Sequence, residues 1–254
     1  MDIDLVGTWA EADHVDLRGR VAVVIDVLRA SSVIVAALGA GATRVVAVAT
    51  VDEGRACAKR LGGNQAGLGR DRVVLGGERG ALRLPGYDLG NSPLEYTPEA
   101  VAGRTVILTT TNGTQAVARA RAADAVLVAA LTNAGAVTSW LLDRRQDVTI
   151  ICAGTEGRLS LDDLFCGGLL VSQVLEPGFV RHLTDGVRLA LGWHDANIGN
   201  ATHVLQSCVH GQRLTSKGFI DDIGFCARID GTDVVPVWDG EGFVPYVRGG
   251  GDDG

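Results

Sequence analysis

The stretch Val21-Ala-Val-Val-Ile-Asp-Val27 decides the fold. Its first five residues are apolar and mostly β-branched, which is typical of a strand that is buried on both faces, as in a parallel sheet. Ser31 and Ser32 follow, and we expect them to cap a helix whose apolar residues run to a pair of glycines. A second strand is expected at 44–49, so this part of the chain predicts a strand–helix–strand unit.

The same alternation continues along the chain. Further strands are expected at 72–75, 104–110, 125–130 and 147–152, and further helices at 52–61, 114–121, 134–143 and 161–175. The region after residue 177 predicts helices at 178–191, 200–213 and 218–225, followed by extended chain at 226–238. Strands that alternate with helices of this length predict an α/β fold, with a largely parallel sheet and helices on both faces.

One long segment departs from this alternation. Residues 76–103 are rich in glycine and proline, and we expect them to form an irregular loop of a length that is usually functional. No stretch has the composition of a linker between domains. Residues 1–248 are therefore expected to form a single domain with a more helical C-terminal portion from about 178, followed by a disordered tail over 249–254.

The charge balance limits the possible partners. The 254 residues include 23 Lys and Arg against 30 Asp and Glu, for a formal net charge of −7. A nucleic-acid backbone or an anionic membrane requires a positive surface, so neither is expected as a partner. No stretch approaches the roughly 20 apolar residues of a membrane helix. The acidic first 20 residues are unlike a secretory signal, so we expect a cytoplasmic protein.

The five cysteines form no CxxC pair, and the five histidines form no HExxH pattern. Neither a zinc site nor a disulfide framework is therefore expected. We expect the cysteines to be small buried thiols in a reducing compartment.

Three polar segments are expected at the carboxyl-end edge of the sheet, where ligands bind in open α/β folds. They are residues 26–32, 109–114 and 152–163, and each leads from a strand end into a helix. Free amides and the positive end of a helix dipole make such turns natural anion sites. Several of them at one edge indicate a phosphate ligand.

Carboxylates lie in the same turns. Magnesium uses such hard oxygen ligands together with water and phosphate oxygens, and the carboxylates in question are Asp26, Glu156, Asp162 and Asp163. Arg29 or Arg79 can neutralise phosphate oxygens through a planar guanidinium. A single Ser or Thr in these turns can equally be an ordinary helix cap. Asp26 differs, because a carboxylate directly after so apolar a strand is costly to bury without a partner. The residues thus favour magnesium-assisted chemistry on a phosphorylated small molecule.

Taken together, these motifs resemble the 2-phosphosulfolactate phosphatase family over roughly residues 3–240. The resemblance is carried by Ile25-Asp-Val-Leu-Arg-Ala-Ser31, Gly76-Gly-Glu-Arg79, Gly86-Tyr-Asp-Leu-Gly-Asn-Ser-Pro93, Thr110-Thr-Asn-Gly-Thr114, Cys152-Ala-Gly-Thr-Glu-Gly-Arg-Leu-Ser-Leu-Asp-Asp163 with the Cys-Gly-Gly that begins at Cys166, and more loosely Gly218-Phe-Ile-Asp-Asp222 through Val235-Pro236.

The resemblance implies a magnesium-dependent phosphatase on a three-layer α/β/α sandwich. It implies hydrolysis of 2-phospho-3-sulfolactate to 3-sulfolactate and phosphate, a step of coenzyme M synthesis in methanogens. The site residues that it implies are, for catalysis, Asp26, Arg29, Glu78, Arg79 and Asn112; for substrate binding, Ser31, Asp88, Asn91, Ser92, Gly113 and Thr114; and for the metal, Asp26, Glu156 and Asp163.

Several alternatives stay open at this point. The attacking group can be a water or Asp26 itself, and the substrate can be another phosphorylated hydroxy acid. A non-catalytic protein that binds a phosphorylated metabolite is a further alternative. A nucleotide-dependent oxidoreductase is disfavoured, because no GxGxxG motif follows a strand. The sequence also allows a homo-oligomer.

Overall fold

The computed structural model describes residues 1–62, 73–175 and 180–247, and its central feature is one large mixed sheet. The strand order is β5-β4-β6-β3-β11-β10-β7-β2-β8-β1-β9. The strands are β1 (Asp2–Val6), β2 (Arg20–Ile25), β3 (Arg44–Val48), β4 (Val73–Arg79), β5 (Leu82–Arg83), β6 (Thr105–Thr109), β7 (Ala125–Ala129), β8 (Asp147–Cys152), β9 (His182–Leu183), β10 (Pro236–Trp238) and β11 (Phe243–Pro245).

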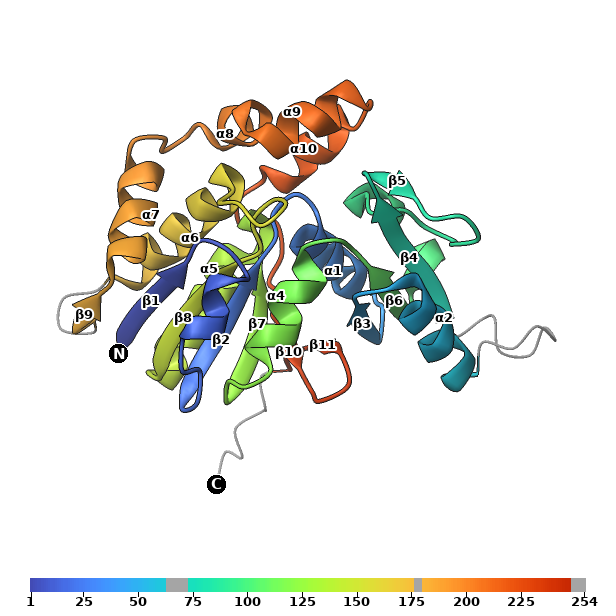
Figure 1. Cartoon of the computed structure of the whole chain (residues 1–254), viewed down its shortest axis with the longest axis horizontal. Coiled ribbons are helices and arrows are strands. Elements are labelled where there is room, and N and C mark those ends of the chain that lie inside the picture. The colour runs from blue at the N-terminus through green and yellow to red at the C-terminus, as the bar shows by residue number, and fades with distance from the viewer. Residues whose placement is uncertain (63–72, 176–179, 248–254) are drawn as a thin grey trace.

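Two parallel blocks make up most of this sheet. One block is β4, β6 and β3, and the other is β7, β2, β8 and β1. The hairpin of β10 and β11 lies between them and pairs antiparallel with β7 on one side and β3 on the other (Figure 1). The expected largely parallel, mixed sheet is therefore confirmed.

Helices cover both faces of the sheet, as expected. They are α1 (Ala30–Gly39), α2 (Val51–Arg60), α3 (Pro98–Val101), α4 (Gly113–Ala120), α5 (Ala134–Arg144), α6 (Leu161–Val174), α7 (Asp185–Asp195), α8 (Ala201–Ser207), α9 (Val209–Ser216) and α10 (Ile220–Cys226), with short 3-10 turns that include η3 (Pro93–Glu95). None of the helices in the described ranges is long and apolar enough to cross a membrane.

Strand β2 shows how the sequence pattern produces the layers. Successive side chains of a strand point to opposite faces. Val21, Val23 and Ile25 pack with α5, α6 and α7 on one face, whereas Ala22 and Val24 pack with α1 and α4 on the other. A strand that is buried on both faces explains the unbroken apolar run.

The strand ends earlier than expected, at Ile25 rather than residue 27. The reason is that the next two amides leave the sheet ladder: Asp26 N–H donates to the Ser31 hydroxyl, and Val27 N–H donates to the Asp163 carboxylate. The expected capping role of Ser31 and Ser32 is also wrong, because α1 begins after Arg29 and the Ser32 hydroxyl donates to Val27 O.

The expected irregular loop over 76–103 is wrong in its first part. Gly76 to Arg79 continue β4, and the later residues include β5, η3 and α3. The glycines permit this close packing, because a Cβ at Gly77 would run into the carbonyl oxygen of Thr109 on β6. Glycine here serves a close approach of two strands rather than an irregular loop.

The C-terminal part is helical, with several differences from expectation. The helix expected at 178–191 is α7, Asp185–Asp195, and it follows the short strand β9. The helix expected at 200–213 is divided at Cys208 into α8 and α9. The extended chain at 226–238 becomes β10 only from Pro236, and neither the short strand β1 nor the return strand β11 was expected. The predicted tail at 249–254 lies outside the described residues.

Helices α8, α9 and α10 lie above the ends of the central strands (Figure 1). We call these three helices, residues 201–226, the helical cap. Contacts that attach the cap to the turns of the sheet edge include Arg29 with Asp222, Arg213 with Glu156, and the Lys217 ammonium with Gly80 O. The cap therefore covers the edge at which the candidate site was expected.

Candidate active site

Asp26 lies at the point where β2 meets α1 and α4. Its Oδ1 accepts a hydrogen bond from Ala30 N–H at 3.2 Å, and the Gly113 backbone also bonds this carboxylate. A Cβ at Gly113 would lie 2.8 Å from Asp26 Oδ2, so only glycine leaves room for the carboxylate at the start of α4. The two turns predicted from the sequence to share an edge are therefore in direct contact.

Asp163 joins a third turn to the same place. Its Oδ1 accepts from Val27 N–H and its Oδ2 accepts from Gly154 N–H, both at 2.9 Å. The carboxylate is buried in the first turn of α6 and links the turn after β2 to the turn after β8. Asp163 thus holds two loops of the site in a fixed relation.

The buried carboxylates raise each other's pKa. Burial raises the pKa of Asp26 to about 7, and the negative charges of Asp162 and Glu78 contribute to the rise. The backbone hydrogen bonds from Ala30 and Gly113 act in the opposite direction. Burial, Asp162 and Asp26 likewise hold the pKa of Asp163 well above its usual range. Burial therefore disfavours the charged forms of these carboxylates, and such strongly shifted pKa values are typical of functional sites.

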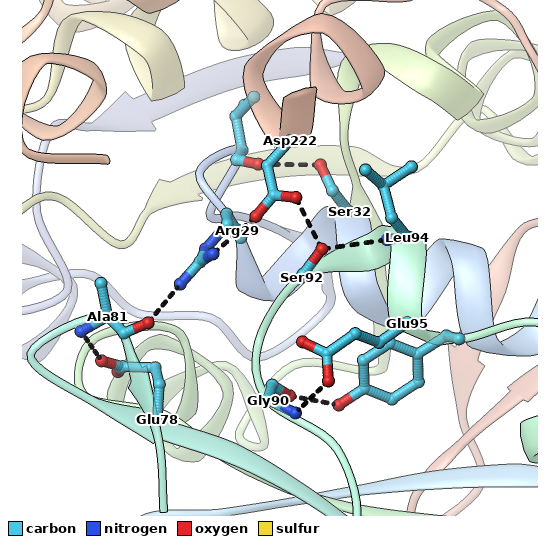
Figure 2. Close-up of polar contacts among 11 residues, drawn as sticks. Arg29, Ser32, Glu78, Ala81, Gly90, Ser92, Leu94, Glu95 and Asp222 are labelled. Atoms are coloured by element: carbon cyan, nitrogen blue, oxygen red, sulfur yellow. Dashed lines mark hydrogen bonds and ion pairs between the residues drawn. The ribbon is translucent and has the colours of Figure 1, made fainter. Parts of the chain in front are cut away.

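Arg29 is the buried cation of the site. Its Nη1 forms an ion pair with Asp222 Oδ2 at 2.6 Å, its Nη2 donates to Ala81 O at 3.2 Å, and its guanidinium lies over the ring of Phe219. Asp222 also accepts from the Ser92 hydroxyl at 2.6 Å, as Figure 2 shows. These contacts join α10, the turn before α1 and the loop that carries Ser92.

Glu78 is held on the opposite side of this network (Figure 2). Its Oε2 accepts from Ala81 N–H at 2.8 Å, and its Oε1 accepts from the amide and hydroxyl of Thr111. Because Ala81 O in turn accepts from Arg29, Glu78 and Arg29 are linked through one residue. Turns that follow β2, β4, β6 and β8 thus meet at a single polar centre.

Three buried polar atoms of this centre have no hydrogen-bond partner within the described ranges. They are Arg29 Nε, Asn91 Oδ1 and Thr110 Oγ1. Buried polar atoms are almost always paired in folded proteins, and an unpaired one is costly. A polar ligand or water at the centre would satisfy them.

The comparisons with known proteins agree with this geometry. The family model described as 2-phosphosulpholactate phosphatase matches residues 8–241. The chain belongs to this family. It is 37% identical over 236 residues to the probable 2-phosphosulfolactate phosphatase of Clostridium beijerinckii, covering 93% of this chain and 96% of the relative. Two more proteins of the same name are each 40% identical to this chain. The one from Thermotoga petrophila covers 85% of this chain and 88% of the relative, and the one from Symbiobacterium thermophilum covers 88% and 93%.

The structure brings together most of the residues expected from the family motifs. Asp26 contacts Ser31 and Gly113, and Asp163 bonds the amide of Val27, the residue after Asp26. Arg29, Glu78 and Ser92 belong to the connected network. Asn91 is buried beside Ser92. Asn112 precedes α4 and Thr114 lies in its first turn, where the Thr114 hydroxyl donates to Thr110 O.

Three expected site residues make other contacts. The Glu156 carboxylate is exposed and forms two hydrogen bonds with Arg213, at 2.6 and 3.1 Å. The exposed Arg79 donates to the backbone oxygens of Glu78 and Ala49, and the exposed Asp88 accepts from Leu75 N–H. Their side chains are thus engaged at the rim of the site, and their predicted roles stay predictions.

Two residues of the site were not selected from the sequence. Asp222 lies in the loosely matching Gly218–Asp222 motif, which was the signal that could have found it. His210 on α9 lies close enough to Asp162, Arg29 and Glu78 for their charges to act on its ring. No sequence pattern pointed to this histidine, because only the folded cap brings it to the edge.

The expected metal ligands Asp26, Glu156 and Asp163 do not form a ready-made cluster. In the described part of the chain, no group of three or more His, Cys, Asp or Glu side chains is arranged to hold a metal ion. Magnesium, however, commonly uses one or two carboxylates together with water and phosphate oxygens. Burial disfavours the charged forms of Asp26 and Asp163, and a cation that arrives with an anionic substrate would compensate that charge.

Proposed function

We propose that this chain hydrolyses 2-phospho-3-sulfolactate to 3-sulfolactate and inorganic phosphate. The observation that carries the proposal is the polar centre itself, which lies inside the span matched by the family model. It brings together Asp26 and Arg29 from the turn between β2 and α1, Glu78 from the end of β4 and Asp163 from the start of α6. The unpaired Arg29 Nε, Asn91 Oδ1 and Thr110 Oγ1 supply donors and acceptors for a polar ligand.

The substrate phosphoryl group is proposed to lie at the first turn of α4. Backbone amides and the dipole of this eight-residue helix favour an anion there, with Gly113 and Thr114 as the first residues. Arg29 forms an ion pair with Asp222, so its positive charge is already largely neutralised within the protein. Its main role is proposed to be orientation through Nε rather than neutralisation of the substrate.

Magnesium is part of this proposal. Asp26 would hold the ion, with Asp163 as the second carboxylate, and Glu156 could join only by leaving Arg213. When bound, Mg²⁺ would neutralise phosphoryl oxygens and lower the pKa of a water. Phosphoryl transfer depends chiefly on such positioning and charge neutralisation.

A water is the attacking group in this proposal, rather than Asp26. Asp26 is assigned to the ion instead, and the backbone hydrogen bonds from Ala30 and Gly113 hold its carboxylate in place while leaving lone pairs for that role. The five free, buried cysteines support a reducing compartment, so we place the reaction in the cytoplasm.

Phosphate release from 2-phosphosulfolactate with and without Mg²⁺ tests the proposal. We expect Asp26→Asn to lower the rate at least about 100-fold, since it removes a charge at the reacting centre. Asp52→Asn, which changes an exposed aspartate on α2, is the matched control and should keep the wild-type rate. Equal rates in Asp26→Asn and Asp52→Asn would contradict the proposed site.

The substrate is tested separately. In the same assay, 2-phosphoglycerate carries a hydroxyl group and phospholactate a hydrogen in place of the sulfonate, and the proposal requires that phosphosulfolactate be preferred to both. Tight binding of phosphosulfolactate without phosphate release would instead identify a non-catalytic binding protein.

A further inference from the structure

A chain of four side chains connects the buried Asp162 to His210 on the cap. Ser160 donates a short hydrogen bond to Asp162 Oδ1, the Ser160 and Thr155 hydroxyls lie 3.1 Å apart, and Thr155 Oγ1 lies 3.4 Å from His210 Nδ1. Thr155, Ser160 and Asp162 come from the turn after β8 and the start of α6, whereas His210 comes from α9. None of the roles given above uses this chain.

The direction of each hydrogen bond follows from the number of hydrogens. The Ser160 hydroxyl has one hydrogen, and it donates that hydrogen in its bond to the Asp162 carboxylate. Ser160 can then only accept a hydrogen bond from Thr155, and Thr155 donates its single hydroxyl hydrogen in that bond. Thr155 can in turn only accept from the ring, so His210 Nδ1 must carry the hydrogen and Nε2 of the neutral ring must be bare.

The position of His210 suits chemistry at the polar centre. Charged groups from four elements lie close enough for their charges to act on its ring: Asp162 on α6, Glu78 on β4, Arg29 before α1 and Arg213 on α9 itself. Nε2 has no hydrogen-bond partner within the described ranges, unlike Nδ1. Burial and the two arginines lower the pKa of His210 against the opposing effect of Asp162 and Glu78, which keeps the ring neutral near pH 7.

We propose that His210 is the acid–base residue of the hydrolysis, acting through Nε2, and that Thr155, Ser160 and Asp162 are positioning residues that select its tautomer. This inference rests on the proposed phosphatase reaction. The oxygen of water forms a bond to phosphorus while the bond from phosphorus to the C2 oxygen of the substrate breaks. Nε2 takes one proton from the water. The departing oxygen keeps the electron pair of the broken bond and receives that proton from Nε2, which restores the neutral ring.

The pH–rate profile tests the role of His210. Wild-type kcat should fall on the acid side with an apparent pKa below 6.5, because a protonated Nε2 cannot accept a proton. His210→Asn should lower kcat by about 10²- to 10⁴-fold and abolish this acid limb. His203→Asn is the matched control, since His203 is an exposed histidine of the same cap. This variant should keep the wild-type kcat and the acid limb of the profile. A wild-type rate or an unchanged acid limb in His210→Asn would overturn the proposal.

The positioning residues have their own test. Ser160→Ala interrupts the chain in its middle and should lower kcat by about 10- to 100-fold with little change in KM. Ser160→Thr retains the hydroxyl and should restore most of the rate. Thr155→Val and Thr155→Ser form a second such pair. Equal activity of the Ala and Thr variants at Ser160 would show that the hydroxyl has no positioning role.

A measurement without substrate separates this inference from the proposed function. The ¹⁵N chemical shifts of the His210 ring should report a protonated Nδ1 and a bare Nε2 in the ligand-free wild type, and Ser160→Ala should remove that preference. A protonated Nε2 in the neutral wild-type ring would overturn the inference even if the protein hydrolyses phosphosulfolactate. Failure of hydrolysis with the expected tautomer would contradict the proposed function, including the use made of His210, but not the tautomer assignment.

Discussion

Two ion pairs attach the helical cap to the sheet edge, and they differ in burial. In the pair of Arg29 with Asp222, the side chains are 1% and 3% exposed, whereas in the pair of Arg213 with Glu156 they are 48% and 64% exposed. Both pairs have a shortest separation of 2.6 Å. Geometry alone therefore does not distinguish them, and the difference lies in what solvent can do when one partner is lost.

Water can solvate the exposed pair but not the buried one. An exposed ion pair is screened by solvent and contributes little to stability. A buried pair also contributes little as a whole, but the loss of one partner leaves an uncompensated charge in a medium that cannot solvate it. The comparison teaches that the cap depends on one buried contact much more than on its exposed counterpart.

The largest effect is expected for Asp222→Ala. It leaves the Arg29 charge buried without its partner, which costs about 3–5 kcal/mol of the free energy of unfolding. It also removes the acceptor of the Ser92 hydroxyl, for about 1–3 kcal/mol more. Chemical denaturation measures the loss. The double variant Arg29→Met with Asp222→Leu should be less destabilised than Asp222→Ala, and the reverse order would contradict this account.

The next effect is the pH dependence that Asp26 confers on the metal-free protein. Its pKa rises from 3.8 to about 7 on folding, so between these values the folded state binds a proton that the unfolded state has lost. Stability should therefore fall as pH rises from about 4 to 7 and then level off, by on the order of 4 kcal/mol from this group. Denaturation across this range should show a flatter curve for Asp26→Asn, and an unchanged slope would refute the assignment.

A smaller effect is expected for Gly113→Ala. The new Cβ would lie 2.8 Å from both Asp26 Oδ2 and Ala30 Cβ, so the start of α4 must shift. Overpacking of this kind costs about 1–3 kcal/mol, and it displaces the Asp26 carboxylate. We expect kcat to fall even under conditions in which the variant stays fully folded, because the displaced carboxylate belongs to the reacting centre. Gly224→Ala on α10, where a Cβ meets open space, is the control: it should keep the activity and should raise rather than lower stability, by up to about 1 kcal/mol, because Ala is the better helix former.

The smallest effect is expected for Glu156→Gln, which breaks the exposed ion pair. Arg213 lowers the pKa of Glu156, so the carboxylate contributes stability above its ordinary value that is lost as pH falls through the lowered value. The unfolding midpoint at pH 7 should hardly change and should depend little on salt. A loss as large as that of Asp222→Ala would invalidate the comparison of the two pairs.

The fold was predictable where the local pattern carries the information. The apolar run that begins at Val21 predicted a strand buried on both faces, and the structure places it near the middle of the sheet. The glycines at 76 and 77 misled the prediction, because glycine serves loops and close strand contacts equally well, and only the neighbouring β6 decides between them.

The site was predictable at the level of turns and less so at the level of side chains. Asp26, Gly113 and Asp163 meet because parallel strands deliver their carboxyl ends to one edge. Glu156 and Asp163 belong to one motif, yet one carboxylate is exposed beside Arg213 and the other is buried between two amides. Arg213 comes from the cap, so the motif alone could not predict that Glu156 would be exposed and paired with this arginine.

The sequence by itself determined the alternation of strands and helices and the polar turns that end the strands, because burial and capping act between residues that are near one another in the chain. Only the tertiary structure decided that the β10–β11 hairpin joins the two parallel blocks, that Asp222 pairs with Arg29, and that His210 reaches the chain of Thr155, Ser160 and Asp162. Those contacts join residues far apart in sequence, and they form only when burial of the cap places their partners within hydrogen-bonding distance.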